Sequence, residues 1–495
     1  MKIVYVSSEI FPFSKTGGLA DVAGSLPKRL AEAGCTIKIF SPKYYQVDER
    51  KFELQYCHDI GELLIKAADH LRPVHVYRSS VKTGKKDVEV YFIDCPYYFY
   101  RNSIYTNDPD ENERFILFSK AVIESLQRLQ WSPDIIHCND WQAGLFPLYI
   151  KDNYSRDGMF DNTATLFTIH NIEYQGRFDA STVLKAEIKI PYFFPGGPVE
   201  FYGDFSFLKA GIVFSDLINT VSKTYAQEIL TPEYGAGLDG VLKDRKPDLF
   251  GIINGVDYNE WDPEKDAHTR YHFSSSDLKG KLKNKKFLLD RFSLPYIKDV
   301  PLIGIVSRLA GQKGFDIISE AFSSLMKLDA QWIILGSGEA KYEDLFLEMA
   351  KKYPEKAAVY IGFNNELSHL IEAGADIFLM PSRYEPCGLN QIYSLKYGTV
   401  PVVRKTGGLA DTVKDWDEAL AKGERTGTGF SFSKYDPVEL LGTLERALER
   451  FKDKKTWQEI QVNGMNKEYS WERAAKEYLV LYKNAVAKRK QGLRI

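Results

Sequence analysis

The stretch that decides the fold is Asp376-Ile377-Phe378-Leu379-Met380-Pro381 followed by Arg383-Tyr384-Glu385-Pro386-Cys387-Gly388-Leu389. Its first part is a short apolar run of the kind that forms a buried strand, and the residues from Gly388 to Gly398 have the length of a helix. Glu385 therefore lies where a predicted strand becomes a helix. Ligands of open α/β sheets bind just beyond the carboxyl ends of the strands. The stretch predicts an α/β unit with a binding site around Glu385.

The heptapeptide Lys-Thr-Gly-Gly-Leu-Ala-Asp occurs twice, at 15–21 and at 405–411. The first copy follows the apolar run from Ile3 to Ser7 and the second follows Val400 to Arg404, and each copy opens a helical stretch. Glycines at such a junction let backbone N–H groups approach a phosphate at the positive end of a helix. The repetition predicts two Rossmann-like units built on one plan, with a cleft between them.

Length and charge limit the class of protein. With 495 residues the chain is too long for one core and fits two domains. A formal net charge of −2 gives no electrostatic reason to expect nucleic acid or an anionic membrane as a partner. No apolar stretch approaches the ~20 residues of a membrane-spanning helix. Met1 leads directly into the first strand candidate, which predicts a cytoplasmic protein without a signal peptide. The five cysteines show no Cys-x-x-Cys pairing, so neither a disulfide framework nor a zinc site is expected.

Apolar runs alternate with helical stretches along most of the chain. Strand candidates are 2–7, 36–40, 88–94, 134–138, 165–170, 216–221, 250–253, 302–307, 331–335, 359–361, 377–380 and 401–404, and the clearest helical stretches of the first half are 18–33 and 113–129. This alternation is typical of parallel sheets with helices on both faces. Pro27 is expected to kink the first helix or end its first segment.

Three further segments carry expectations of their own. The turn signal Asn254-Gly255 marks the predicted domain boundary. The Pro- and Gly-rich segment 190–207 is expected to be a packed surface loop, and it either covers a site or serves as a structural plug. The charge run from Lys281 to Lys286 is expected to be a solvated helix face.

Polar residues stand at the ends of several strand candidates. In the first half Asp140 follows 134–138 and His170 closes 165–170, where a structural and a functional histidine are equally plausible. In the second half Arg308 follows 302–307, and Lys313 follows five residues later. Two cations at one strand end would bracket a pyrophosphate, although both could equally be surface ion-pair partners.

A dinucleotide-binding dehydrogenase is the weaker interpretation. Gly336-Ser337-Gly338 follows a strand candidate, but position 341 is Lys where the fingerprint needs its third glycine.

Taken together, these motifs resemble glycosyltransferase family 5, the family of bacterial glycogen synthases and plant starch synthases. The resemblance spans essentially the whole chain. Besides the two heptapeptides, it rests on Ser8-Glu9, His137 to Trp141, Thr168 to Asn171, Ile253 to Asp257, Ser307 to Leu309, Gln312 to Gly314 and Glu385 to Leu389. It implies an α/β GT-B fold in which two Rossmann-like domains face each other across a deep cleft. The implied parts are an acceptor-side domain at 1–253, a nucleotide-sugar-binding domain at 254–470, and a C-terminal helix at 471–495 that packs back on the first domain.

The same resemblance implies a reaction and a site. The reaction would be the retaining transfer of glucose from ADP-glucose to the non-reducing end of an α-1,4-glucan such as glycogen, with no metal and no cofactor. Arg308 and Lys313 would neutralise the diphosphate leaving group. The implied catalytic residues are Glu385, His170, Arg308, Lys313 and Asp140. The implied substrate-binding residues are Lys15, Gly17, Gly18, Asp21, Asn254, Cys387, Gly388, Leu389, Thr406, Gly407 and Gly408.

Several alternatives stay open at this point. Cys387 invites interpretation as a nucleophile, but the resemblance favours a packing or backbone role. No pair of carboxylates about 5 Å apart stands out, which favours a front-face mechanism over a covalent glucosyl-enzyme. The donor is either ADP-glucose or UDP-glucose. Two other functions remain: a GT-B transferase that acts on a small sugar acceptor, and a catalytically silent protein that binds a sugar nucleotide or a glucan.

Overall fold

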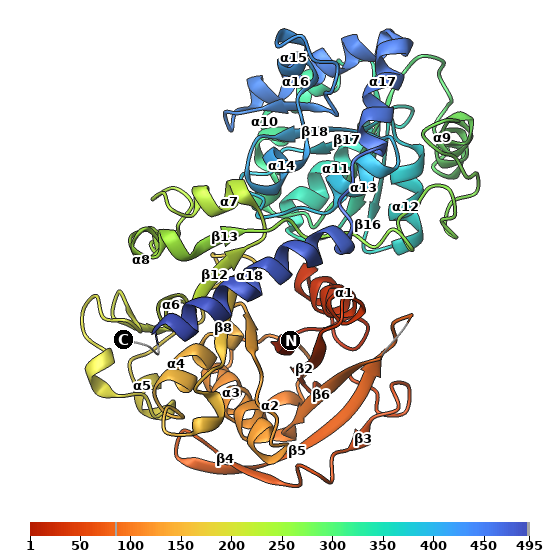
Figure 1. The fold of residues 1–495 in the computed structure, drawn as a ribbon. Coiled ribbons are helices and arrows are strands. Elements are labelled where there is room, and N and C mark those ends of the chain that lie inside the picture. The colour runs from red at the N-terminus through yellow and green to blue at the C-terminus, as the bar shows by residue number, and fades with distance from the viewer. Residues whose placement is uncertain (85–86, 493–495) are drawn as a thin grey trace. The chain divides into compact units, whose positions relative to one another are not determined.

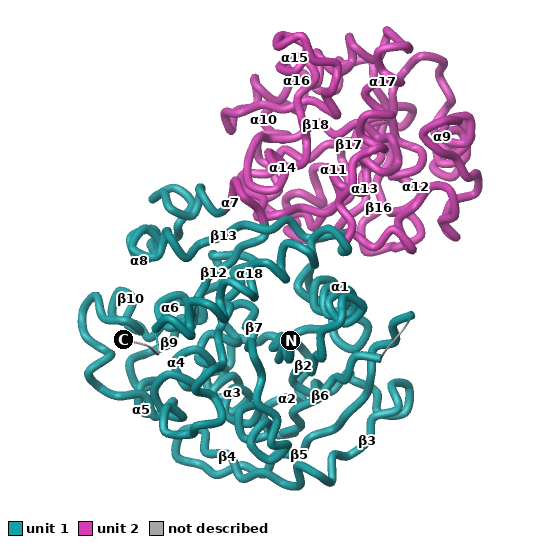
Figure 2. Tube along the Cα trace, viewed as in Figure 1, with its two compact units in different colours: residues 1–221, 226–255, 471–495 teal, residues 222–225, 256–470 magenta. Residues whose placement is uncertain are grey.

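The computed structural model describes residues 1–84 and 87–492, and the chain forms two compact units (Figure 2). Unit 1 contains Met1–Val221, Ala226–Gly255 and the C-terminal segment from Trp471. Unit 2 contains Ser222–Tyr225 and Val256–Ser470. The chain thus leaves unit 1 after Gly255 and returns to it at Trp471.

Unit 1 is built around a ten-stranded sheet (Figure 1). Its order is β13 (Leu249–Gly251), β12 (Leu217–Thr220), β8 (Ala164–Ile169), β7 (Ile135–Asn139), β1 (Lys2–Val6), β2 (Thr36–Pro42), β6 (Val88–Asp94), β5 (His70–Val81) and β3 (Gln55–Tyr56), with β4 (Leu63–Ala67) paired to β5. The strands from β13 to β6 are parallel, and β3, β4 and β5 are added antiparallel. The parallel strands are nearly continuous apolar runs because helices cover both faces of the sheet.

The register of this sheet brings three strand ends to one edge. Val6 of β1 lies opposite Cys138 of β7, and Cys138 lies opposite Phe167 of β8. The segments that follow β1, β7 and β8 therefore start side by side.

The helices of unit 1 come from both the first half of the chain and its C-terminal segment. They are α1 (Gly18–Glu32), α2 (Pro96–Phe99), α3 (Glu111–Arg128), α4 (Leu145–Lys151), α5 (Thr182–Lys185), α6 (Phe207–Phe214), α8 (Asp239–Asp244) and α18 (Trp471–Gly492). Helix α18 packs against α1, β7 and β8. Residues 493–495 of the predicted C-terminal helix lie outside the described part of the chain. The expectation that Pro27 ends a first segment of α1 is wrong, because the helix continues through this residue to Glu32.

The segment 190–207 contains more regular structure than a surface loop. It holds β10 (Glu200–Phe201) and β11 (Asp204–Ser206), which form a small antiparallel sheet with β9 (Arg177–Phe178). The strands are too short to show a pattern of their own, and they are defined by the pairing of β10 with β11 and of β11 with β9.

Unit 2 contains a six-stranded, wholly parallel sheet. Its order is β16 (Ala357–Ile361), β15 (Gln331–Gly336), β14 (Leu302–Val306), β17 (Ile377–Met380), β18 (Val400–Arg404) and β19 (Phe430–Phe432). The helices are α9 (Lys279–Arg291), α10 (Phe315–Leu325), α11 (Ala340–Lys352), α12 (Asn365–Gly374), α13 (Asn390–Lys396), α14 (Gly407–Thr412), α15 (Trp416–Ala421), α16 (Pro437–Lys452) and α17 (Lys454–Met465). Helix α7 (Lys223–Glu228) begins in unit 2. Apolar clusters around Trp332 and around Phe378 fill the core.

The charge run in α9 is only partly solvated. Lys281 and Lys285 are buried, one helical turn apart, on the side that packs against α12. Lys281 Nζ donates to Thr399 Oγ1 at 2.6 Å, and Lys285 Nζ lies 2.7 Å from Asp376 Oδ2. The expectation of a solvated face is therefore wrong for these two lysines. Their spacing of four residues shows that they share a face, but only the packing of α9 shows which face is buried.

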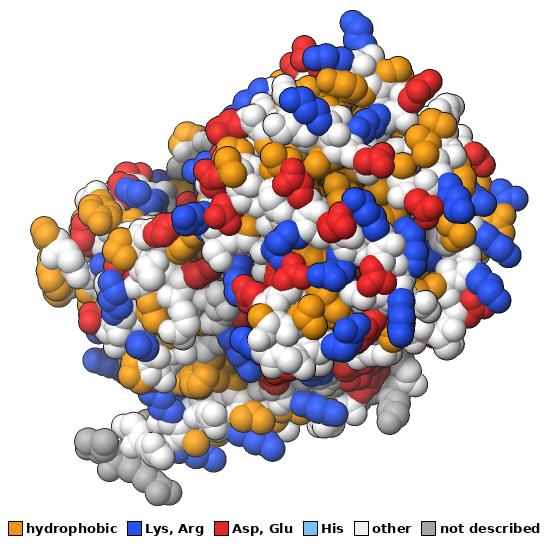
Figure 3. Space-filling view, turned by 90° about the horizontal axis from the view of Figure 1, so that it is seen from above, with side chains coloured by type: hydrophobic (Ala, Val, Ile, Leu, Met, Phe, Trp, Pro, Cys, Tyr) orange, Lys and Arg blue, Asp and Glu red, His pale blue; other side chains and the backbone are white. Residues whose placement is uncertain are grey.

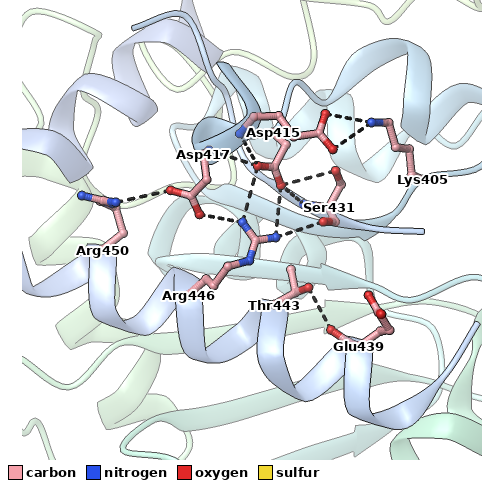
Figure 4. Close-up of polar contacts among 9 residues, drawn as sticks. Lys405, Asp415, Asp417, Ser431, Glu439, Thr443, Arg446 and Arg450 are labelled. Atoms are coloured by element: carbon pink, nitrogen blue, oxygen red, sulfur yellow. Dashed lines mark hydrogen bonds and ion pairs between the residues drawn. The ribbon is translucent and has the colours of Figure 1, made fainter. Parts of the chain in front are cut away.

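An ionic cluster joins the edge strand β19 to α15 and α16 (Figure 4). Arg446 Nη1 lies 2.6 Å from Asp417 Oδ2, and its Nη2 donates to the Ser431 main-chain oxygen at 3.0 Å. The buried Asp415 accepts hydrogen bonds from the main-chain N–H groups of Asp417 and Glu418 in α15 and lies 3.3 Å from Arg446 Nη2. The arginine thereby compensates the charge of a buried carboxylate at the end of the sheet.

Charges of both signs are mixed over the face that Figure 3 shows, where Lys and Arg side chains stand next to Asp and Glu. Within residues 1–84 and 87–492, no helix combines the length and the apolarity needed to cross a bilayer.

Candidate active site

The first heptapeptide of unit 1 is held by a buried carboxylate that follows β1. Glu9 accepts hydrogen bonds from the Thr16 main-chain N at 2.5 Å, from Thr16 Oγ1 at 2.7 Å and from the Gly17 main-chain N at 3.1 Å. The Tyr105 hydroxyl donates to the same carboxylate at 2.7 Å. The sequence offered Glu9 only as part of a family motif. Its position two residues after an apolar strand, in front of the glycines, was the available signal.

Lys15 and Asp21 form an ion pair across the first heptapeptide. Lys15 Nζ lies 2.7 Å from Asp21 Oδ1, and the lysine side chain is 46% exposed. Burial raises the pKa of Asp21, and the neighbouring Lys15 opposes that shift. Between them, Gly17 and Gly18 face open space, because a Cβ atom added at either position would meet no atom within 4 Å.

Asp140 and His170 meet at the ends of β7 and β8. Asp140 Oδ1 accepts the His170 main-chain N–H at 2.7 Å, and His170 Nε2 lies 2.9 Å from Asn139 Oδ1. Burial raises the pKa of Asp140 to about 7 and lowers the pKa of His170 to about 3. Asp140 also has a φ of 56°, a left-handed conformation that is strained for a residue with a side chain. The imidazole is neutral throughout the physiological range.

Asn254 lies apart from these residues at the end of unit 1. It follows β13, which is separated from β8 by β12. The side chain is buried, and its Oδ1 has no hydrogen-bond partner among the described residues. No hydrogen bond or ion pair joins it to Lys15, Asp140 or His170 within the described part of the chain.

In unit 2 the predicted carboxylate and one predicted cation are in direct contact. Lys313 Nζ lies 2.6 Å from Glu385 Oε2, and Ser382 Oγ donates to the same oxygen at 3.0 Å. Lys313 belongs to the short helical turn Gly311–Lys313 after β14, and Glu385 follows β17, the neighbour of β14 in the sheet. Arg308 is exposed and donates a long hydrogen bond of 3.4 Å to Gln312 Oε1. The structure thus joins Lys313 to Glu385 but not to Arg308.

The second heptapeptide packs tightly against the segment that carries Glu385. A Cβ atom at Gly407 would lie 1.9 Å from the Glu385 main-chain oxygen, and one at Gly408 would lie 1.9 Å from the Cys387 main-chain oxygen. The Gly408 N–H donates to the main-chain oxygens of Glu385 and Pro386, both at 3.1 Å. An anion at this N–H would therefore compete with two internal acceptors.

The remaining predicted residues of unit 2 support the same loop. Gly388 has a φ of 70°, in the left-handed region that favours glycine. Gln391 Nε2 donates to the main-chain oxygens of Cys387 and Gly388, both at 3.0 Å. Leu389 precedes α13, and Thr406 is fully buried. The Cys387 thiol is buried in this packing, as a structural role requires.

Phe363 is a site candidate that the sequence reasoning missed. Its side chain is 87% exposed, and it follows β16, whose neighbour β15 ends at Gly336. The Gly362 N–H donates to the Gly336 main-chain oxygen at 2.9 Å, so the aromatic ring starts beside the turn Gly336-Ser337-Gly338. An exposed aromatic residue directly after a strand, and before the helix cap Asn364, was the signal in the sequence.

Comparison with known proteins identifies the family. The glycogen synthases of Desulforudis audaxviator and Thermotoga maritima are each 45% identical to this chain, over 504 and 496 aligned residues. These alignments cover 100% and 99% of this chain, and 99% of each relative. The chain belongs to the glycogen synthase family. The family model "Starch synthase catalytic domain" matches residues 2–244, and "Glycosyl transferases group 1" matches residues 287–461.

Solved structures of related proteins agree with this assignment. The catalytic domain of starch synthase IV from Arabidopsis thaliana, bound to ADP and acarbose, is 32% identical with a TM-score of 0.89, and the match covers 98% of this chain and 99% of that one. A sucrose-phosphate synthase from Thermosynechococcus elongatus, at 16% identity and a TM-score of 0.58, shares the fold alone. The chain is a glycosyltransferase with a two-domain, GT-B-like α/β fold, and the predicted family and fold class are confirmed.

Proposed function

We propose that the protein is a glycogen synthase that transfers glucose from ADP-glucose to the non-reducing end of an α-1,4-glucan with retention of configuration. The observation that carries this proposal is the 45% identity to glycogen synthases over the full chain. The ADP bound to the Arabidopsis relative supports the choice of an adenine nucleotide.

In unit 2, Lys313 and Arg308 would meet the diphosphate of the donor. Both follow β14, and cations directed at charge that grows on a leaving group stabilise the transition state. Glu385 holds the Lys313 ammonium through Oε2. Glu385 Oε1 has no hydrogen-bond partner among residues 1–84 and 87–492, so it can accept a hydroxyl of the glucosyl group. One carboxylate would thus orient both the cation and the sugar.

The exposed ring of Phe363 would stack on the nucleobase. Stacking of a base on an aromatic side chain is worth about 1–3 kcal/mol. Phe363→Ala should therefore raise KM for ADP-glucose about tenfold with little change in kcat. Phe363→Tyr, which keeps the ring, should stay close to wild type. An unchanged KM in Phe363→Ala would remove this residue from the donor site.

In unit 1, Lys15, Asp140 and His170 would contact the donor from their strand ends. His170 and Asp140 would contact hydroxyls of the glucosyl group, and Lys15 with the open Gly17 and Gly18 would face the phosphates. A front-face mechanism, with a phosphate oxygen as the base for the acceptor hydroxyl, needs no protein nucleophile. Trapping of a glucosyl group on a carboxylate of the enzyme would refute it.

The test of the function is nucleotide release from ADP-glucose and from UDP-glucose, each with and without glycogen. Release of ADP that depends on glycogen, with little release of UDP, is the expected result. Glu385→Gln and Lys313→Met should each lower turnover by about 100-fold or more, because each removes a charge-assisted contact to the reacting groups. Their thermal unfolding should stay near that of the wild type. Turnover with a small sugar acceptor, but none with glycogen, would instead indicate a different GT-B transferase.

A further inference from the structure

Hydrogen bonds fix the orientation of the Asn139 side chain at the end of β7. Asn139 Nδ2 donates to the Val6 main-chain oxygen at 2.9 Å. A carbonyl oxygen only accepts hydrogen bonds, so the NH₂ group must lie on this side. The amide oxygen therefore faces the other way, 2.9 Å from His170 Nε2 and 3.3 Å from the Tyr5 hydroxyl. Asn139 is completely buried, so water cannot substitute for either partner.

This orientation decides which nitrogen of His170 carries the proton. An amide oxygen can only accept, so Nε2 must be the N–H of the ring. A neutral imidazole has one N–H, which leaves Nδ1 as an acceptor. Nδ1 has no hydrogen-bond partner among the described residues. We infer that Asn139 is a positioning residue that holds the His170 proton on Nε2, so that His170 meets the substrate as a hydrogen-bond acceptor through Nδ1.

The surroundings of Asn139 keep its oxygen in place. The Tyr5 hydroxyl donates to that oxygen, and the Tyr5 ring packs edge-on against His137 with 4.7 Å between the ring centroids. His137 is held in turn by the Tyr482 hydroxyl of α18 at 2.8 Å and by Thr168 Oγ1 at 2.7 Å. All of these side chains belong to unit 1 and are fully buried. The amide has no room to rotate away from His170.

The main chain of His170 is held by Asp140, the residue that follows Asn139 in the sequence. Asp140 Oδ1 accepts the His170 N–H at 2.7 Å, so two consecutive residues hold the backbone and the ring of the same histidine. The strained φ of 56° at Asp140 is the backbone conformation that accompanies this double contact.

The tautomer has a consequence for the substrate. The hydroxyl that meets His170 must donate its proton to Nδ1. A group that only accepts, such as a fluorine atom in place of that hydroxyl, cannot make this bond. The part of the inference that concerns a sugar hydroxyl rests on the proposed function, whereas the position of the proton does not.

The position of the proton can be observed directly by NMR. We would label the histidines of the full chain with ¹⁵N, record long-range ¹H–¹⁵N spectra between about pH 6 and pH 8, where an ordinary histidine titrates, and assign His170 by its loss in His170→Gln. The expected spectrum is that of a neutral ring protonated on Nε2 at every pH. A proton on Nδ1, or an equal mixture of the two tautomers, would overturn the inference.

Variants of Asn139 test its role. Asn139→Leu has a similar volume but no acceptor, and we expect the His170 spectrum to change to a mixture of tautomers or to the Nδ1–H form. Asn139→Asp loses the donor to the Val6 main-chain oxygen but keeps an acceptor toward His170, and should retain the proton on Nε2. Ser119→Ala, which removes a buried hydroxyl of α3 that donates to the Phe115 main-chain oxygen, should leave the His170 spectrum unchanged. A wild-type spectrum in well-folded Asn139→Leu would refute the role of Asn139.

Substrate analogues test the same point without a change in the protein. The donor is prepared with each glucosyl hydroxyl away from the reacting carbon replaced either by hydrogen or by fluorine. The glucosyl hydroxyl that contacts His170 is the one whose replacement has no further effect on the Kd of the donor in the His170→Ala variant. At that position the deoxy and the deoxyfluoro donors should each bind about tenfold more weakly than the parent donor, and Kd is compared because fluorine itself slows glycosyl transfer. A deoxyfluoro donor that binds as tightly as the parent donor would show that His170 donates, and would overturn the inference. If glycogen-dependent release is absent altogether, the proposed function fails, and the NMR result still decides the position of the proton.

Discussion

In unit 1 the heptapeptide at 15–21 leaves its glycines in open space, whereas the identical heptapeptide at 405–411 in unit 2 uses them for close packing. Nothing lies within 4 Å of a Cβ atom added at Gly17 or Gly18. At Gly407 and Gly408 such an atom would lie 1.9 Å from main-chain oxygens. The same two residues therefore allow the approach of a ligand in one unit and the approach of the chain itself in the other.

The charged ends of the two heptapeptides differ in the same way. Lys15 and Asp21 pair with each other, whereas Lys405 pairs with Glu418. Asp411 accepts hydrogen bonds from the main-chain N atoms of Lys223 and Thr224 at 2.7 and 3.1 Å, at the start of α7. Identical residues at identical spacing thus have roles that depend on the segments packed against them.

The largest expected difference between the two copies is in the stability of glycine variants. Gly408→Ala should destabilise unit 2 by about 3 kcal/mol or more, because its Cβ atom meets a rigid main-chain oxygen. Gly18→Ala should stay within about 0.5 kcal/mol of the wild type. Urea unfolding measures both values. Equal destabilisation by the two variants would contradict the comparison.

The lysines should differ in activity by the next largest amount. Lys15→Met should lower kcat/KM for ADP-glucose about 100-fold, as expected for the loss of a charge-assisted contact to phosphate. Lys405→Met removes only an exposed ion pair with Glu418 and should stay within about twofold of the wild type. Initial rates at saturating glycogen measure both. A large loss in Lys405→Met would mean that the second copy also faces the donor.

A smaller effect is expected at the aspartates. Asp411→Ala should destabilise the protein by about 1 kcal/mol, the usual value for loss of an acceptor at a helix N-terminus. Asp21→Ala removes a partly exposed ion pair and should cost less than about 0.5 kcal/mol. The difference is measured by urea unfolding at neutral pH. A larger cost for Asp21→Ala would reverse the assignment of the two roles.

The smallest expected effect concerns pH. Because burial raises the pKa of Asp21, the folded protein binds a proton more readily than the unfolded chain. Stability from this group is therefore complete below the unfolded pKa of about 3.9, and it is lost as the pH rises through the higher folded pKa. As the pH rises above about 4, the free energy of unfolding of Asp21→Asn should increase relative to that of the wild type by less than about 1 kcal/mol. If the free energies of unfolding of the two proteins changed with pH in parallel, this expected increase would be contradicted.

The sequence predicted the central strands well and the added ones poorly. Strands β6 and β17 have exactly the predicted bounds, 88–94 and 377–380, because buried parallel strands are apolar runs. The long strand β5 was missed because it is half exposed and contains Pro73. The sequence did not predict the burial of Lys281 and Lys285, because the groups that bind a buried lysine lie far from it in the sequence and are known only from the structure.

The site shows the same limit. The strand ends that carry Asp140, His170 and Glu385 could be predicted from the positions at which the apolar runs end. The partners of these residues did not, since the contact of His170 with Asn139 depends on the register of β7 and β8. Contacts of this kind join residues about thirty positions apart or more. Their roles in the reaction stay predictions.

Helix α18 has a consequence for the order in which the protein folds during synthesis. Its Tyr478 and Tyr482 hydrogen-bond to Asn219 and His137, in strands that leave the ribosome more than two hundred residues earlier. Unit 2 has all of its segments once Ser470 has emerged, whereas unit 1 is still without α18. The unit that begins the chain is therefore the last to be completed, which reverses the usual N-terminal-first order. A nascent chain that is stalled before Trp471 should hold a finished unit 2 beside a unit 1 whose buried polar groups await their partners.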